Sequence, residues 1–505
     1  MRFLRIGCLL LDDGQSVMLG KLESLFGFRN NVMDLKRIRI IQGGMGIHMS
    51  SWKLAKAVSL KGQLGVVSGT AIDTVVARKL QLGDLDGNIR RALDHCPLKG
   101  VAQRVKERFF VEGGKDPAAP FKDLGSWSLP MSRGRIELMI AANFVEVYLA
   151  REGHDGPIGI NFLEKIQLPA LPSLFGAMLA GVHVVLMGAG VPAAIPEVLD
   201  LLSQGKEASL VIGVESTSPS DAAAVARLDP SEYADGELPQ LSRPHFIGIV
   251  SSDTIARSLE KRAPGGVAGY VIEHHTAGGH NAPPRRDRTA QDEGMSSYGI
   301  KDNPDFEKIR RIGKPFWLGG GYANPEGLAR ALAEGATGIQ VGTPFAYSDE
   351  SEMNPDLKSE VIRQVLAGTV SVETSFDASP TGYPFKLVRP EGNHLVTDAV
   401  EPRHRVCDMG YLRTAYRKED GSLGWRCGAE PVASYVAKGG KEEDTRNKVC
   451  LCNGLMAVVG LGQVRKGVVE LPVLTSGDEL VNIGRYLKDG KSRYSASDVI
   501  DYILA

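Results

Sequence analysis

The chain has 505 residues, 43% of them hydrophobic, which is enough for one large barrel with additions or for two to three domains. Its 59 Lys and Arg residues nearly balance its 60 Asp and Glu residues, and the net charge of -1 excludes the basic character of a nucleic-acid-binding protein. No apolar run reaches the ~18–20 residues that span a bilayer, and six cysteines at this length are typical of a reducing compartment. We therefore expect a cytoplasmic protein that binds neither nucleic acid nor membrane.

The first clear elements form a strand–helix–strand unit. An apolar run begins at Ile38, and a helix is predicted over 52–60, with Ser50 or Ser51 as its N-cap. The stretch 64–68 is the second strand. A βαβ unit of about thirty residues predicts a parallel sheet.

The segment 70–156 is too long for a single crossover between strands. Its apolar residues recur at helical spacing, and a stretch rich in Gly and Pro interrupts them at 113–130. We therefore expect a helical insertion with helices over 72–82, 85–93, 102–110 and 135–151. The sheet resumes with strands over 157–162 and 182–187.

Two stretches qualify as the next strand, 210–214 and 246–250, because both are rich in β-branched residues. Three later strands are predicted over 269–273, 315–318 and 338–341. Asn324 and Asn354 each precede a proline, a pattern that starts helices.

Glycines follow four of these strands, at once or within five residues: Gly43 and Gly44, Gly278 and Gly279, Gly319 to Gly321, and Gly342. The carboxyl ends of parallel strands meet at one edge, where ligands sit in barrel enzymes. Glycine also lets the backbone approach a ligand closely. His280 follows Gly279, and an imidazole exchanges protons near neutral pH. Alone, Gly-Gly-His is more often a tight turn, but the four glycine-ended strands together favour one shared site.

Four motifs in this order, spanning about residues 38 to 390, resemble the nitronate monooxygenase family (2-nitropropane dioxygenase-like), which includes the flavin-dependent enoyl-ACP reductases. The motifs are Gln42 to Met45, Ala277 to His280, Gly319 to Gly321 and Gln340 to Thr343. The resemblance implies a longer, divergent member with the α/β fold of a (β/α)8 TIM barrel that binds FMN. The family order favours 246–250 as the fifth strand and makes 205–244 a small insertion.

The FMN phosphate needs backbone N–H donors, its ring needs close backbone contact, and its pyrimidine edge needs both donors and acceptors. The predicted phosphate ligands are Gly320, Gly321, Gly342 and Thr343. The predicted ring ligands are Gly44, Met45 and Ser68, and Asn161 is predicted at the pyrimidine edge. The resemblance adds Glu273 and Gly279 near the ribityl chain, and Gly278 is a further predicted cofactor-binding residue.

The resemblance also places His280 at the family's catalytic histidine position, a role that we expect to need titration near pH 7. His274 and His275 are better explained as structural histidines. At the position where some relatives have a lysine near the phosphate, this chain has Ser251 and Ser252. Arg257 or Lys261 are candidates to supply the missing charge.

A polar loop over 281–304 carries Arg285, Arg286 and Arg288. Long loops at this face are commonly lids or binding loops. The arginines fit a phosphate or carboxylate of a larger substrate about as well as they fit a solvated charge run.

Beyond residue 400 the chain becomes more polar and holds Cys407, Cys427, Cys450 and Cys452. Their spacing matches neither a zinc ribbon nor a ferredoxin, so we predict free thiols and no metal. The predicted organisation is an extension over 1–34, the barrel over 35–400 with insertions at about 70–156 and 205–244, and a C-terminal extension over 401–505.

The expected function is an FMN-dependent, nitronate monooxygenase-like oxidoreductase that takes a small-molecule substrate. An NAD(P)H-dependent enoyl thioester reductase and a flavin-binding partner protein in a biosynthetic assembly remain alternatives. NAD(P)H is the candidate electron donor, and a homodimer is the candidate assembly.

Overall fold

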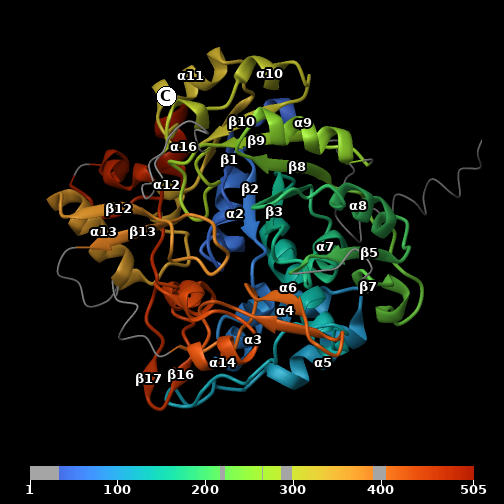
Figure 1. The fold of residues 1–505 in the computed structure, drawn as a ribbon. Coiled ribbons are helices and arrows are strands. Elements are labelled where there is room, and N and C mark those ends of the chain that lie inside the picture. The colour runs from blue at the N-terminus through green and yellow to red at the C-terminus, as the bar shows by residue number, and fades with distance from the viewer. Residues whose placement is uncertain (1–32, 216–221, 264, 286–297, 391–404, 489) are drawn as a thin grey trace, which may run out of the picture.

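The computed structural model describes residues 33–215, 222–263, 265–285, 298–390, 405–488 and 490–505. Eight parallel strands form its centre (Figure 1). They are β1 (Ile40–Gln42), β2 (Gly65–Ser68), β3 (Ile158–Leu163), β4 (Val184–Gly188), β8 (His245–Val250), β9 (Gly269–Glu273), β10 (Phe316–Gly319) and β11 (Gly338–Val341). Their order is β1-β11-β10-β9-β8-β4-β3-β2, and a parallel bridge between Ile41 and Leu64 joins the two ends. The sheet is therefore a closed barrel, as predicted.

The barrel interior is apolar. One cluster of fully buried side chains draws on the strands and on the segment before β1 but on none of the helices, which places it inside the barrel; it includes Ile41, Val66, Leu186, Ile247, Val271 and Trp317. Indole Nε1 of Trp317 donates to the carbonyl oxygen of Ile38 at 2.8 Å, so the one polar atom of this side chain is satisfied. Burial of the strands on both sides explains their continuous apolar runs.

Helices surround the barrel, and their starts follow the sequence signals. Ser51 caps α2 (Trp52–Leu60), Asn324 caps α11 (Pro325–Ala333) and Asn354 caps α13 (Pro355–Ala367), each through its side-chain oxygen. The other helices after strands are α7 (Ala170–Leu179), α8 (Ile195–Ser203), α9 (Asp253–Arg262), α10 (Phe306–Arg310) and the single turn α12 (Thr343–Ala346). None of the described helices is long and apolar enough to cross a membrane.

The segment between β2 and β3 is helical, as expected. It contains α3 (Ile72–Gln81), α4 (Asn88–His95), α5 (Lys99–Phe109) and α6 (Arg133–Arg151). The long helix α6 packs against both α2 and α7, so it belongs to the ring around the barrel. The shorter helices α3 to α5 lie against α6.

The fifth barrel strand is β8, the one chosen by family order. The competing stretch forms β5 (Ala208–Ile212), which pairs antiparallel with β7 (Ala224–Leu228) outside the barrel. Between them, β6 (Val214–Glu215) pairs with β14 (Thr414–Arg417). The small insertion and the C-terminal part therefore share a sheet.

The chain beyond β11 adds a hairpin, a small sheet and several short helices (Figure 1). These elements are β12 (Val370–Ser375), β13 (Phe385–Pro390), β15 (Leu423–Arg426), α14 (Val432–Ala437), α15 (Leu451–Val458), β16 (Val464–Arg465), β17 (Val468–Val469), the 3-10 helix η5 (Asp478–Tyr486) and α16 (Ala496–Leu504). Four short 3-10 turns, Leu35–Arg37, Pro230–Tyr233, Ile300–Asp302 and Glu442–Thr445, complete the described elements. Ser495 caps α16, as predicted.

Helix α16 packs against both α2 and α11. It therefore fills the place in the ring that the single turn α12 leaves open. The C-terminal region supplies a barrel helix and is not only an appendage.

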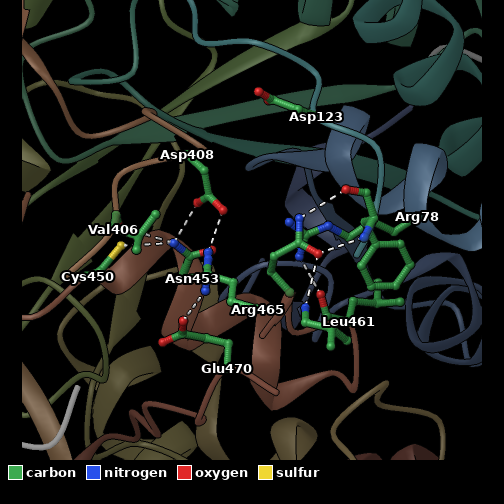
Figure 2. Close-up of polar contacts among 12 residues, drawn as sticks. Arg78, Asp123, Val406, Asp408, Cys450, Asn453, Leu461, Arg465 and Glu470 are labelled. Carbon is green, nitrogen blue, oxygen red and sulfur yellow. Dashed lines mark hydrogen bonds and ion pairs between the residues drawn. The ribbon is translucent and has the colours of Figure 1, made fainter. Parts of the chain in front are cut away.

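A buried polar network attaches the C-terminal region to α3 (Figure 2). The guanidinium of Arg78 on α3 donates to the carbonyl oxygen of Leu461. Nearby, Arg465 forms ion pairs with Asp408 and with Glu470, and the amide of Asn453 donates to Asp408 at 2.8 Å. The bond from Arg78 to Leu461 joins the C-terminal region to the insertion, and the other contacts hold the segments of the C-terminal region to one another.

Candidate active site

A cavity of about 430 Å³ opens at the carboxyl ends of the barrel strands. The segments that follow all eight strands contribute to its lining. This is the position of ligand sites in barrel enzymes.

The structure brings the predicted site residues together with one exception. The residues that line the cavity are Gly44, Met45, Asn161, Glu273, Gly278, Gly279, His280, Gly320, Gly321, Gly342 and Thr343. Ser68 is the exception and does not line the cavity, and its place at the flavin ring stays a prediction. Its buried hydroxyl donates to the carbonyl oxygen of Gly46 at 2.7 Å and thereby shapes the loop after β1.

Four backbone amides form a donor cradle after β10 and β11. The amides of Gly320, Gly321, Gly342 and Thr343 donate to no acceptor within the described parts of the chain. Gly320 and Gly321 have φ angles of 88° and 77°, and a Cβ on Gly320 would lie 2.7 Å from Oγ1 of Thr276. Glycine is therefore required at Gly320, and the free amides suit an anionic oxygen.

Asn161 presents an unsatisfied acceptor. Its Nδ2 donates to the carbonyl oxygen of Gly44 at 3.3 Å, while its buried Oδ1 has no hydrogen-bond partner among the residues described. A Cβ on Gly44 would lie 2.4 Å from Cβ of Asn161, so the two segments approach as closely as glycine allows. A ligand N–H at this place would satisfy Oδ1.

These donors and acceptors fit FMN: free amides for a phosphate, and an orphaned amide oxygen for the pyrimidine edge. The charge expected near the phosphate is not found. In the described lining there is no Lys or Arg side chain, and Arg257 and Lys261 are exposed on α9. Ser251 lines the cavity, whereas Ser252 caps α9.

His280 is held by the hairpin β12–β13. Its Nε2 lies 2.7 Å from Oγ of Ser379, and its ring meets the Phe385 ring edge to face at 4.9 Å. Burial, with a further contribution from the charge of Lys165, lowers the pKa of His280 to about 3. The imidazole is therefore neutral at pH 7, and the expectation that it titrates near pH 7 was wrong. The sequence did not reveal the burial, which the hairpin imposes from about a hundred residues away.

Two carboxyl groups face the same cavity, Glu273 at the end of β9 and Glu479 in η5. Burial raises the pKa of Glu273 to about 7. The Oε2 atom of Glu479 is buried without a hydrogen-bond partner among the described residues, although the guanidinium of Arg485 lies 3.8 Å away.

His274 and His275 do not line this cavity. Together with Arg285 and Tyr298 they surround a small adjoining cavity of about 40 Å³, which shares Ser251, Glu273 and residues 281–283 with the main cavity. His274 Nδ1 lies 3.0 Å from Oγ1 of Thr276, and the His275 ring stacks on Tyr298 with centroids 4.1 Å apart. These contacts agree with structural roles. Arg286 and Arg288 lie outside the described residues.

The C-terminal region contributes to the cavity, which sequence reasoning missed. The contributing residues are Tyr411, Leu412, Leu451, Cys452, Leu455, Thr475, Ser476, Gly477 and Glu479. The amide of Gly477 donates to Oγ1 of Thr343 at 2.8 Å, and Oγ1 of Thr475 accepts from the amide of Gly279 at 3.0 Å. Of these residues, only Gly477, in a Ser-Gly-Asp turn, has a local sequence feature that indicates close approach of the backbone to another segment.

All four C-terminal cysteines are free thiols. Burial raises the pKa of Cys450 to about 12, which favours a neutral thiol. Among the described residues, no three His, Cys, Asp or Glu side chains are grouped to hold a metal ion. The absence of a metal stays a prediction.

Comparison with known proteins gives partial matches. No protein-family model matches the chain. The chain is 27% identical over 143 residues to (3aS,4S,5R,7aS)-5-hydroxy-7a-methyl-1-oxo-octahydro-1H-indene-4-carboxyl-CoA dehydrogenase from Mycobacterium tuberculosis, over 28% of this chain and 36% of that protein. It is 26% identical over 186 residues to a nitronate monooxygenase from Paraburkholderia phytofirmans, over 35% of this chain and 47% of that protein. The matches thus span less than half the length of either relative.

Among solved structures, FabK from Thermotoga maritima superposes with a TM-score of 0.47 at 16% identity, covering 96% of this chain and 94% of that one. The barrel itself is established by the strand order and its closure. Both sequence relatives are oxidoreductases by name, and the chain is similar to them over about a third of its length.

Proposed function

We propose that the protein is an FMN-dependent oxidoreductase of the nitronate monooxygenase type. One observation carries the proposal: a single cavity contains both the cradle of unpartnered amides after β10 and β11 and the unpartnered Oδ1 of Asn161. The first fits a phosphate and the second fits the N–H of a pyrimidine edge. When bound there, the flavin supplies the two-electron chemistry that side chains lack.

The chain's own part is to bind and orient the substrate. A neutral His280 in the cavity wall donates a hydrogen bond to a substrate oxygen, as a neutral imidazole can at pH 7. An alkyl nitronate places oxygens of negative charge beside the carbon that is oxidised. A donor fixed on such an oxygen stabilises charge without moving a proton. A small nitronate also needs no cation from the lining.

The test begins with cofactor content. Purified protein is expected to be yellow and to release FMN on denaturation; a colourless protein that FMN does not reconstitute would contradict the assignment. Anaerobic mixing with ethyl nitronate is then expected to bleach the flavin absorbance, and oxygen to restore it. Light scattering during chromatography tests the predicted homodimer in the same preparation.

Reduction of an enoyl thioester by NAD(P)H is the second candidate. The cavity lining includes the apolar side chains of Leu412, Leu451 and Leu455, which are more than a small nitronate requires. One of the two sequence relatives is also named for a carboxyl-CoA compound. Oxidation of NADPH that depends on a crotonyl thioester, without reaction of ethyl nitronate, would favour this candidate. Tight FMN binding with neither reaction would favour the flavin-binding partner protein.

A further inference from the structure

A chain of hydroxyl groups connects His280 to a lysine. His280 Nε2 lies 2.7 Å from Oγ of Ser379, which lies 2.8 Å from Oγ1 of Thr381. The ammonium of Lys165 donates to the same Oγ1 at 3.5 Å. Lys165 follows β3, whereas the two hydroxyls lie in the β12–β13 hairpin, so the chain spans two walls of the cavity.

The donors in this chain have one consistent direction. An ammonium group can only donate, so Oγ1 of Thr381 accepts from Lys165. Two acceptors are then within reach of the Thr381 proton: Oγ of Ser379 at 2.8 Å and, at 3.4 Å, Nε2 of His280 itself. Oγ of Ser379 also accepts from the backbone amide of Thr381 at 3.2 Å. If the Thr381 hydroxyl donates to the fully buried Ser379, both acceptor positions of Ser379 are occupied and its own proton points at Nε2 of His280. If the Thr381 hydroxyl donates to the ring directly, Nε2 is again the acceptor. A ring that accepts at Nε2 carries its single proton at Nδ1.

Lys165 is held in this position by contacts other than the hydroxyl. Its ammonium lies 4.2 Å from the centre of the Tyr383 ring, a favourable cation–π contact, and Tyr383 lines the cavity. Partial burial lowers the pKa of Lys165 to about 8 against the opposing charge of Glu164. The lysine is therefore mostly charged at pH 7. The other titratable groups that face the cavity are Glu273, Glu479, Tyr322, Tyr383, Tyr411 and Cys452.

We propose that Lys165 is a positioning residue that fixes His280 as the Nδ1–H tautomer through Thr381 and Ser379. The tautomer is a property of the folded chain, but its use in turnover rests on the proposed function. Only the Nδ1–H form, with Nε2 occupied by Ser379, leaves an N–H available to the cavity. In the opposite tautomer, Nε2–H would donate to Ser379, and the unprotonated Nδ1 could only accept a hydrogen bond from the substrate.

The direct test is nitrogen NMR of the histidine rings in protein labelled with ¹⁵N-histidine, with His280 assigned from the spectrum of His280→Gln. At pH 7 we expect the Nδ1–H pattern for His280. Lys165→Met is expected to lose this preference, and Lys165→Arg, which keeps a donor that is always charged, to retain it. Thr381→Val should act like Lys165→Met although the lysine remains. Lys206→Met, at an exposed position after α8, serves as the matched control.

The pH dependence of the His280 tautomer shows whether the charge of Lys165, rather than its packing alone, fixes the ring proton. In the wild type the preference should weaken above pH 8, as Lys165 loses its charge, whereas in Lys165→Arg it should persist. An Nε2–H pattern in the wild type, or an unchanged Nδ1–H pattern in Lys165→Met, would overturn the proposal.

Kinetics then connect the tautomer to function. On whichever of ethyl nitronate and crotonyl thioester reacts, Lys165→Met should lower kcat about 10- to 100-fold at unchanged FMN content, and Lys165→Arg should recover most of it. Wild-type kcat in Lys165→Met would overturn the role in turnover. If neither compound reacts, the proposed function fails, while the NMR result still decides the tautomer.

Discussion

Gly278 and Gly477 lie backbone against backbone at the edge of the cavity. A Cβ added to Gly278 would lie 2.7 Å from the amide nitrogen of Gly477, and one added to Gly477 would lie 2.7 Å from the carbonyl oxygen of Thr276. The amide of Asp478 donates to that same carbonyl at 2.9 Å. The C-terminal segment therefore holds the loop that leads to His280, and neither glycine can accept a side chain without displacing the other.

Replacement of Gly477 by alanine should displace this loop. Because a shift of about 1 Å in a site can reduce rate by about 10²-fold, we expect a loss of that order in kcat/KM, with a smaller effect on stability. Flavin titration, steady-state kinetics and thermal unfolding measure the three quantities. Gly236→Ala is the control, since a Cβ there meets no atom within 4 Å. Wild-type kinetics in Gly477→Ala would show that the contact does not position the loop.

His280→Ala should bind FMN nearly normally and lose turnover by about 10²–10⁴-fold. Since burial and Lys165 keep its pKa near 3, the wild-type pH–rate profile should show no limb near pH 6.5 from this residue. His274→Ala and His275→Ala should retain activity within a few fold, because neither residue lines the larger cavity that holds His280. Unchanged turnover of His280→Ala at full flavin occupancy would instead direct attention to those two histidines.

A small and a large side chain at position 342 should have different effects on flavin binding. A Cβ at this position would lie 3.5 Å from Sδ of Met45, which is ordinary contact, so Gly342→Ala should fold and bind flavin almost normally. Gly342→Leu would extend into the cavity beside the amide cradle and should weaken FMN binding by at least tenfold, while the barrel stays folded. Fluorescence titration with FMN, alongside circular dichroism, distinguishes the two effects; equal affinity of both variants would remove Gly342 from the phosphate site.

Glu273 should make flavin binding depend on pH. Burial raises its pKa from 4.5 to about 7, so the carboxyl is neutral below pH 7 and charged above it. The charged form repels a phosphate in the same cavity by ~1 kcal/mol, about a fivefold loss of affinity as pH rises through 7. Glu273→Gln should bind FMN with this dependence removed. Riboflavin, which lacks the phosphate, is the control ligand and should show little change in the wild type.

Tyr411 joins the C-terminal region to the helical insertion. Its hydroxyl donates to Asp73, lies 2.9 Å from Oγ1 of Thr74 and accepts from Arg135 at 3.3 Å, all within the interior. Tyr411→Phe removes these three hydrogen bonds and should lower the free energy of unfolding by about 1–3 kcal/mol, although Arg135 and Asp73 keep their ion pair at 2.8 Å. Tyr502→Phe is the control, because its hydroxyl bonds to none of the described residues; equal unfolding curves for the two variants would discount the network.

Most of the barrel could be predicted from local features of the sequence. Apolar runs followed by glycine predicted the last three strands. Residues that cap helices through their side chains predicted the starts of α2, α11, α13 and α16. These signals act within a few residues of the chain, so they are visible without the fold. The fifth strand, however, required family order, because the candidate stretches 210–214 and 246–250 each contain three β-branched residues.

The rest of the site depends on contacts between distant segments. Nothing local in Lys165, Ser379 or Thr381 indicates that they meet at His280. Burial, and after it the charge of Lys165, lowers the pKa of the imidazole, and neither is visible in the local sequence. Ser68 lies at the end of β2, which predicted a place in the cavity lining, but its hydroxyl donates to the carbonyl oxygen of Gly46 instead. Tyr411 and Gly477 were overlooked because the C-terminal region carries no barrel pattern.

The hydrogen bond from Gly477 to Thr343 joins residues 134 positions apart, and that between Tyr411 and Thr74 joins residues 337 apart. Contacts of such long sequence separation form late in folding, because a large loss of chain entropy precedes them. A barrel that has closed but not yet received residues 474–479 would hold its cofactor poorly. Recovery of bound-flavin fluorescence should therefore lag behind the recovery of helical circular dichroism during refolding, and mild denaturant should release the flavin before the barrel opens.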